Sequence, residues 1–342
     1  MTPPLPGPPV DLRSDTVTRP DARMREAMAR AEVGDDVLDG DPTMRALEER
    51  IAGLLSTEDA LWVPSGSMGN LIALCVHLDR GDRFLAPDHA HILEHEVGTA
   101  AWLAGGMPRA LPWTAGPGAV SPSDVTRAVA RGGPYFALRD RLLCLENTHN
   151  AAGGTVTAPR EHRALVDAAH AAGLLVHLDG ARLWNAAVAL GVPVAELAAG
   201  ADSVQVCLSK GLGAPVGSVL AGGRAFVGEA RRVRKMLGGG IRQGGVLAAA
   251  GLVALERVDR LAADHEHARL LAAGLADRGW RTAVPRTNIV VLPVDDPSHT
   301  VSVLAERGVR TVPTGTGVRM VTHHDVSRAD VLRAVAAFPA PD

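Results

Sequence analysis

Lys210 lies where an apolar, strand-like run ends and a glycine-rich turn begins, in the segment SVQVCLSKGLGAPVGS over residues 203–218. The chain has 35 basic residues, and only Lys210 and Lys235 among them are lysines. Arginine keeps its proton at every useful pH, whereas a lysine amine can lose its proton and attack a carbonyl carbon. The position of Lys210 therefore indicates covalent amine chemistry, and the alternative is a lysine without a role in a loop.

Polar side chains follow other apolar runs in the same way. Asp179 comes directly after the run LLVHL, and Glu146 and His149 lie in the segment LENTHN. The segment PSGSMGN places Gly66 where a strand turns into a helix, and backbone N–H groups at such a turn favour an anion such as phosphate. The carboxyl ends of strands in an open α/β sheet form the ligand site. An amine, a carboxylate and a phosphate cradle are together the parts of a pyridoxal phosphate site.

The elements that must position these residues alternate along the chain. The strand-like runs DALWVP, RLLCLENT, GLLVHLDGA and ADSVQVCLSKG are separated by helical segments such as PREHRALVDAAHAAG, with Pro near its start and Gly at its end. This alternation predicts an α/β fold with three layers (α/β/α), in which helices cover both faces of a mostly parallel sheet.

The pattern changes after the segment GGGIRQGG. A long Ala/Leu-rich stretch from Val246 to about Arg278 predicts helix, and TNIVVLPV, RTVPTG and GVRMVTHHD predict strands before a closing helix SRADVLRAVAAF. We therefore expect a flexible, Pro-rich tail over residues 1–10 and a large cofactor-binding domain over residues 11–250, with an N-terminal arm at 11–45. A smaller C-terminal α+β domain is expected over residues 251–342.

The composition is that of a globular protein with a sizeable core. Apolar residues make up 46% of the 342 residues, charged residues make up 21%, and the net charge is −3. This charge argues against nucleic acid and anionic membranes as partners, and no apolar run is long enough to cross a membrane. The scattered cysteines Cys75, Cys144 and Cys207 argue against a disulfide framework and favour a reducing cytoplasm.

Longer motifs carry a resemblance to a known family. They extend in order from residue 11 to about residue 328: DLRSDTVTRP, VGDDVLDGDPT, PSGSMGN, HILEHEVG, ENTHN, HLDGARLWNAAVALG, CLSKGLGAPVGS, KMLGGGIRQGG and VRMVTHHDVS. With these motifs the sequence resembles the low-specificity L-threonine aldolases. They are pyridoxal phosphate enzymes with the fold of aspartate aminotransferase (fold type I).

The resemblance implies a role for each matching position. Lys210 would bind the cofactor covalently, and Asp179 would pair with its pyridine nitrogen. Arg182 would hold the substrate carboxylate and the cofactor side of the site, since its planar fork suits bidentate binding. The phosphate-binding turn would consist of Gly66, Ser67 and Met68.

Histidines cluster in the segment DHAHILEHEVG. Its spacing to Glu96 and Gly98 makes His91 the counterpart of the family histidine that stacks on the cofactor ring, whereas His89 and His95 are expected at the surface or behind the site. His149 resembles the histidine near the substrate β-hydroxyl. The base that removes the hydroxyl proton is His91, His149 or a bound water, because a histidine titrates in the useful range.

Further residues of the site would come from distant segments. Ser14 and Arg319 resemble the remaining ligands of the substrate carboxylate. Arg242 resembles an arginine that reaches the phosphate from a partner subunit, and Lys235 is either near the substrate in the same region or a solvated charge. These contributions imply a dimer with shared active sites, and the family suggests a tetramer.

The chain departs from the family in GDDVLDGDPT, where Leu38 and Asp39 replace the usual Tyr-Gly. The expected reaction is retro-aldol cleavage of an L-β-hydroxy-α-amino acid to glycine and an aldehyde. The alternatives are another β-eliminating lyase or aminotransferase of the same fold, a protein that binds the cofactor without catalysis, and a zinc hydrolase using His89, His91, His95 and the segment THHD. We expect no metal, because these histidines lack a settled ligand spacing.

Overall fold

The computed structural model describes residues 7–129, 134–315 and 317–340, and seven strands of these residues form one central sheet. The strand order is β2-β8-β7-β6-β5-β3-β4, and β8 runs in the direction opposite to the other strands of this sheet. The strands are β2 (Asp59–Val63), β3 (Arg83–Pro87), β4 (Met107–Leu111), β5 (Asp140–Glu146), β6 (Leu175–Gly180), β7 (Ser203–Cys207) and β8 (Ser218–Gly222). The predicted mostly parallel sheet is confirmed.

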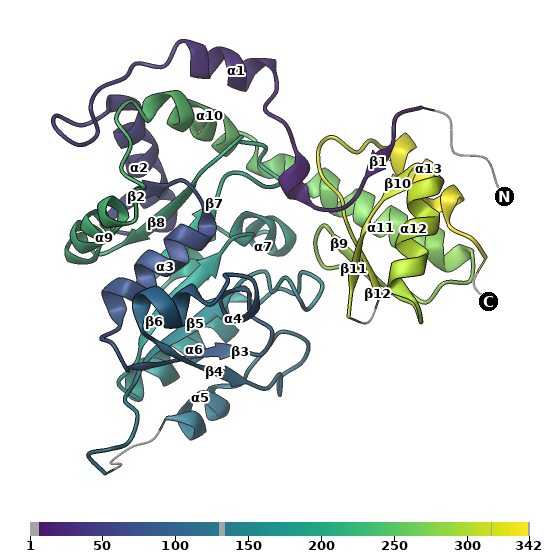
Figure 1. Cartoon of the computed structure of the whole chain (residues 1–342). Coiled ribbons are helices and arrows are strands. Elements are labelled where there is room, and N and C mark those ends of the chain that lie inside the picture. The colour runs from purple at the N-terminus through teal and green to yellow at the C-terminus, as the bar shows by residue number, and fades with distance from the viewer. Residues whose placement is uncertain (1–6, 130–133, 316, 341–342) are drawn as a thin grey trace.

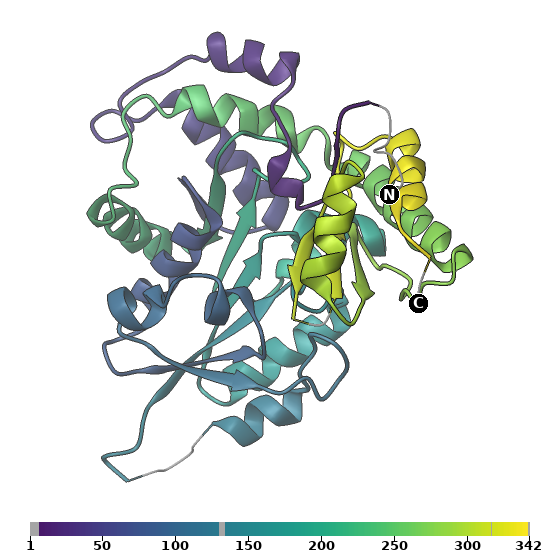
Figure 2. The same cartoon turned by 45° about the vertical axis from the view of Figure 1, so that its right-hand side comes forward.

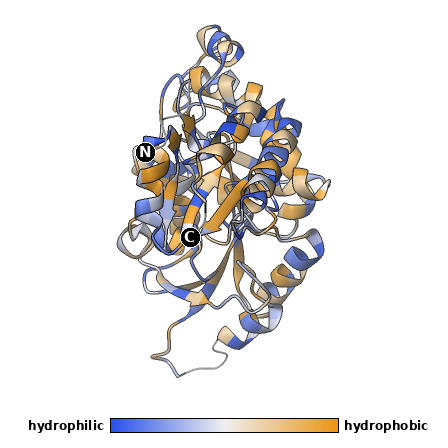
Figure 3. Ribbon diagram, turned by 90° about the vertical axis from the view of Figure 1, so that its right-hand side faces the viewer, coloured by the Kyte–Doolittle hydropathy of each residue, from blue (hydrophilic) through white to orange (hydrophobic). Residues whose placement is uncertain are grey.

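The inner strands are apolar on both faces because helices cover both. In β5, Leu143 and Leu145 belong to one core cluster, while Leu142 and Cys144 belong to another on the opposite face. This alternation follows from the two-residue repeat of a strand. Figure 3 shows the result as hydrophobic strands at the centre of the molecule and hydrophilic segments toward its outside.

Helices pack on each side of the sheet. On one side α8 packs against α2 and α6, and on the other side α3 packs against α9 and η2. The helices of this larger lobe are α1 (Ala22–Ala29), α2 (Pro42–Leu55), α3 (Gly66–His77), α4 (His91–Glu94), the π-helix η2 (Ala100–Ala104), α5 (Pro122–Ala128), α6 (Pro159–Ala171), α7 (Leu183–Leu190), α8 (Val194–Ala198), α9 (Arg224–Met236) and α10 (Gly245–Leu255).

A smaller lobe lies beside the sheet, in yellow and green in Figures 1 and 2. An antiparallel sheet of order β11-β12-β9 packs with three helices, and β1 pairs with β10. Its elements are β1 (Val10–Asp11), η1 (Asp15–Val17), η3 (Val258–Arg260), α11 (Leu261–Asp277), β9 (Ile289–Pro293), α12 (Pro297–Glu306), β10 (Val309–Arg310), β11 (Val312–Thr314), β12 (Gly317–Val321) and α13 (Arg328–Ala337).

The helical stretch predicted from Val246 to Arg278 is interrupted between α10 and α11. A turn here carries the chain from the larger to the smaller lobe, and Arg257 in this turn forms an ion pair of 2.6 Å with Asp21. The domain limits at residues 250 and 251 stay a prediction. The N-terminal segment begins as a strand of the smaller lobe and then enters the space between the lobes.

No helix of the described residues is long and apolar enough to cross a membrane.

Candidate active site

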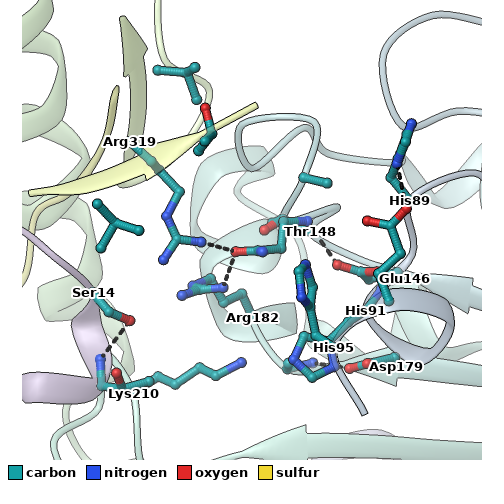
Figure 4. A pocket seen from close by; sticks show the side chains of 18 of the residues that line it. Ser14, His89, His91, His95, Glu146, Thr148, Asp179, Arg182, Lys210 and Arg319 are labelled. Atoms are coloured by element: carbon teal, nitrogen blue, oxygen red, sulfur yellow. Dashed lines mark hydrogen bonds and ion pairs between the residues drawn. The ribbon is translucent and has the colours of Figure 1, made fainter. Parts of the chain in front are cut away.

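A cavity of about 850 Å³ lies between the carboxyl ends of the central strands and the smaller lobe (Figure 4). The structure brings six of the predicted site residues into its lining: Ser14, His91, Asp179, Arg182, Lys210 and Arg319. They come from segments that span the chain from η1 to β12, so the cavity exists only when both lobes are in place.

Asp179 and Lys210 follow neighbouring strands. Asp179 is buried near the end of β6, where its Oδ1 accepts a hydrogen bond of 3.0 Å from the backbone N–H of Ala181. Lys210 lies three residues after β7, and its carbonyl oxygen accepts hydrogen bonds from the Thr18 hydroxyl and the Gly213 N–H, both 2.9 Å long. These bonds fix the backbone, and the side chain of Lys210 extends into the cavity (Figure 4).

Arg182 is held by a buried carboxylate. Its Nε and Nη2 donate to the two oxygens of Asp15 over 2.9 and 2.6 Å, in the bidentate geometry that suits a guanidinium. Burial opposes the charge of Asp15, but the Arg182 charge and its hydrogen bonds prevail, so the pKa of Asp15 lies well below its ordinary value. Asp15 therefore stays ionised and keeps Arg182 in one orientation.

Asn150 joins this arginine to Arg319. Its Oδ1 accepts from Nη1 of Arg182 over 3.1 Å and from Nη1 of Arg319 over 2.9 Å (Figure 4). Burial, and then the neighbouring Arg182 charge, lower the pKa of Arg319. Two guanidinium groups side by side in a partly buried cavity form a binding site for an anion, and their planar shape suits a carboxylate.

His91 begins α4 and forms a pair with Glu96. Nδ1 of His91 lies 2.9 Å from Oε1 of Glu96. Burial lowers the pKa of His91, whereas the hydrogen bond to Glu96 and the nearby Asp179 charge raise it. The upward effects are together larger, so the net shift of this pKa is upward. Burial, with the Asp179 charge, raises the pKa of Glu96. A group of His91, Glu96 and Asp179 has ligand atoms within 4.8 Å of one another. His89 and His95 also line the cavity, but they do not belong to this group.

Glu146 ends β5 and lines the same cavity. Its oxygens accept from the backbone N–H groups of His91 and Asn150, over 2.7 and 2.8 Å. Burial, and then the charge of Asp179, raise the pKa of Glu146 to about 7. This carboxyl group can therefore hold a proton near neutral pH.

His149 is buried and does not line the cavity. Its ring packs edge-on against Trp113, with 5.3 Å between the ring centroids, and Trp113 does line the cavity. Burial lowers the pKa of His149 to about 4, so its imidazole is neutral at pH 7. Both ring nitrogens are buried and have no hydrogen-bond partner among the residues that the structure describes.

The predicted phosphate turn also lies outside the lining. Gly66, Ser67 and Met68 form the first turn of α3, and Ser65 caps this helix by accepting from the Met68 N–H over 3.2 Å. A Cβ on Gly66 would lie 2.9 Å from Sγ of Cys207 in β7. The close packing of α3 on β7 is therefore already a sufficient reason for glycine at this position. The cap thus occupies the N–H of Met68, and Gly66 and Ser67 provide the other N–H groups of this helix terminus.

Lys235 and Arg242 are exposed and do not line the cavity of their own chain. Lys235 lies in the last turn of α9, and Arg242 forms an ion pair of 3.7 Å with Asp35. Leu38, which replaces the family tyrosine, is also exposed. Their predicted roles at a partner's site stay predictions.

Sequence reasoning missed Asp15, Asn70, Trp113 and Asn150 as parts of the site. Asp15, Asn70 and Asn150 were visible as members of the motifs DLRSDTVTRP, PSGSMGN and ENTHN. Trp113 carries no comparable local signal, because a tryptophan has many ordinary positions in a core.

Comparison with known proteins agrees with this geometry. The beta-eliminating lyase family matches residues 11–297. The chain belongs to this family. Low-specificity L-threonine aldolase 1 of Arabidopsis thaliana is 45% identical over 341 residues, which cover 96% of this chain and 95% of that protein. The low specificity L-threonine aldolase of Escherichia coli strain K12 is 41% identical over 335 residues, which cover 97% of this chain and 98% of that protein.

The fold has solved counterparts as well. A threonine aldolase structure from Leishmania major matches with a TM-score of 0.82 at 22% identity, and the match covers 96% of this chain and 98% of that one. The predicted family and fold class are confirmed, and family membership makes this protein a lyase.

Proposed function

We propose that this protein is a pyridoxal phosphate-dependent aldolase. It cleaves L-threonine, L-allo-threonine and related L-β-hydroxy-α-amino acids to glycine and an aldehyde. The observation that carries the proposal is the gathering of the Lys210 amine, the Asp179 carboxylate and the two guanidinium groups of Arg182 and Arg319 around one cavity.

The described residues fit the cofactor. Lys210 offers an amine for its aldehyde, Asp179 offers a carboxylate for its ring nitrogen, and His91 offers an imidazole for its ring face. The cavity volume of about 850 Å³ leaves room for both the cofactor and an amino acid. Arg319 Nε and Thr148 Oγ1, both in lining residues, are buried and have no partner among the described residues, so they can bond to a bound molecule.

The side chains divide the work of the reaction. Arg182 and Arg319, with Ser14, bind the substrate carboxylate, and Asp15 and Asn150 hold the two arginines in place. This clamp sets the direction of the Cα–Cβ bond, and that direction decides which bond breaks. Pyridoxal phosphate, held by Lys210 and Asp179, would supply an electron sink for the pair of the broken bond. The proton of the β-hydroxyl goes to His91, which lines the cavity, or through a water to His149, whose ring packs against Trp113.

For the assembly we propose a dimer with shared sites that pairs into a tetramer. Leu38 and Met236 are 76% and 81% exposed, although both are large apolar side chains. The ion pair between Asp36 and Arg234 joins their two segments, so both side chains belong to one region of the surface. A partner subunit would cover this region and receive Arg242 and Lys235. For the compartment we propose the cytoplasm, which the three free cysteines support.

The test uses the visible spectrum of the purified protein, before and after addition of L-threonine or L-allo-threonine, with glycine and acetaldehyde assayed in the same tube. Borohydride then fixes the cofactor to its lysine, and peptide mass spectrometry decides between Lys210 and Lys235. Lys210→Ala should lose the visible band, and Lys235→Ala should keep it. A protein that stays colourless with added pyridoxal phosphate contradicts the proposal.

The products also separate the alternatives. A keto acid formed without free ammonia would indicate an aminotransferase, and a keto acid formed together with ammonia would indicate a β-eliminating reaction. A yellow protein that forms no product would bind the cofactor without this chemistry.

A further inference from the structure

Asn70 lies one turn after the start of α3 and is 1% exposed. It is the only residue in that part of α3 whose side chain reaches Asp179 according to the hydrogen bonds of the described residues. It thus connects the helix that begins with Gly66 to the carboxylate at the end of β6.

The amide of Asn70 lies between two carboxylates. Its Nδ2 donates one hydrogen bond to Oδ2 of Asp179 and one to Oε1 of Glu96, both 2.7 Å long. A primary amide has two N–H donors on one side and one carbonyl acceptor on the other. Because ionised carboxylates only accept, both of these hydrogen bonds require the NH₂ group.

The carbonyl side of Asn70 has its own partner. Nε2 of His177 lies 3.1 Å from Oδ1 of Asn70, so this nitrogen must carry the hydrogen. The other nitrogen, Nδ1, then accepts from the hydroxyl of Ser203 over 2.8 Å. Burial lowers the pKa of His177 to about 3, which leaves a neutral ring with one tautomer. The orientation of the Asn70 amide is therefore fixed from both sides.

Both carboxylates that Asn70 binds act on the cofactor site. Asp179 lines the cavity directly, and Glu96 holds Nδ1 of His91, which also lines it. Without the amide the two carboxylates would face each other with fewer donors, and like charges at close range repel. The Asn70 side chain therefore fixes Asp179, which would pair with the ring nitrogen of the cofactor. Through Glu96 it also fixes His91, which would stack on the ring face.

We propose that Asn70 is the positioning residue of the cofactor site, which holds Asp179 and, through Glu96, His91 in place by donating one hydrogen to each of Asp179 and Glu96. The inference rests on the proposed function. It assigns to Asn70 no contact with substrate, because the carboxylate clamp of Arg182 and Arg319 lies elsewhere in the cavity.

The test measures the dissociation constant of pyridoxal phosphate for the full-length protein, by titration of the visible band. Asn70→Ala should raise this constant about 10- to 100-fold, as expected when hydrogen bonds to charged groups are lost. The matched control is Asn185→Ala, because Asn185 is also a buried asparagine and lies 3.2 Å from Nε2 of His265, outside the site. The control should change the constant less than about 2-fold.

A double-mutant cycle separates positioning from a general loss of structure. If Asn70 acts through Asp179, adding Asn70→Ala to Asp179→Ala should raise the constant by less than about 3-fold further. If Asn70→Ala raised the dissociation constant by the same factor in the wild type and in Asp179→Ala, the inference would be overturned. An unchanged dissociation constant in the single variant Asn70→Ala would also overturn it.

Asn70→Asp provides a variant of nearly identical shape in case the alanine variant does not fold. It replaces the NH₂ donors by acceptor oxygens and, when ionised, puts a third carboxylate beside Asp179 and Glu96. Its dissociation constant at pH 8 should therefore exceed that of the wild type by at least about 10-fold. An unchanged constant contradicts the inference. A wild-type protein that binds no pyridoxal phosphate contradicts the proposed function instead.

Discussion

Asp264 is a buried carboxyl group that the proposed reaction does not use. It lies in α11 and is 4% exposed. A methyl group built on Gly211, next to Lys210, would lie 3.8 Å from Oδ2 of Asp264 and 4.0 Å from Oδ2 of Asp15, so both carboxylates face the same point between the lobes. Burial, and then the Asp15 charge, raise the pKa of Asp264 to about 7, although Arg260 lowers it.

This shift sets the sign of a pH effect on stability. The ordinary pKa of the group is 3.8, so between pH 4 and 7 the folded protein holds a proton that the unfolded chain has lost. The stability that this proton contributes is fully present below pH 4 and is lost as the pH rises through 7. Each pH unit in this window costs about 1.4 kcal/mol, so the loss between pH 5 and pH 7 is about 3 kcal/mol.

Asp264→Asn tests this reasoning, because an amide has the shape of the neutral carboxyl group and does not titrate. Relative to the wild type, the variant should gain about 3 kcal/mol in free energy of unfolding on going from pH 5 to pH 8. Urea unfolding of both holoenzymes, at equal protein and cofactor concentrations, measures this difference. Asp277→Asn, an exposed position near the end of the same helix, is the control and should show no such gain. An equal difference at both pH values would refute the placement of a protonated Asp264.

The carboxylate clamp gives two further predictions. Asp15→Ala leaves Arg182 buried without its partner and should lower the free energy of unfolding by about 3–5 kcal/mol. Urea unfolding measures this loss, and Glu26→Ala, which breaks a surface ion pair, should cost less than about 1 kcal/mol. Asn150→Ala removes the acceptor shared by Arg182 and Arg319, so steady-state kinetics should show KM for L-threonine raised about 10-fold with a smaller change in kcat. A fall in kcat at constant KM would speak against a role in binding.

The sequence by itself determined the residues that end the central strands. The apolar runs that become β5, β6 and β7 are local patterns, and the polar residue that follows each run is local too. These patterns alone therefore place Asp179 and Lys210 at one edge of a sheet. The motifs that surround them also determined the family, which the comparisons with known proteins confirm.

The tertiary structure alone decided which distant side chains meet there. Asp15 binds Arg182 across 167 residues of sequence, and Asn70 binds Asp179 across 109. Such pairs depend on the order of strands in the sheet and on how the smaller lobe lies against it, and no local periodicity encodes either. The burial that shifts the pKa values of Glu146 and Asp264 has the same origin, because a carboxyl group loses its water only when segments distant in the sequence enclose it.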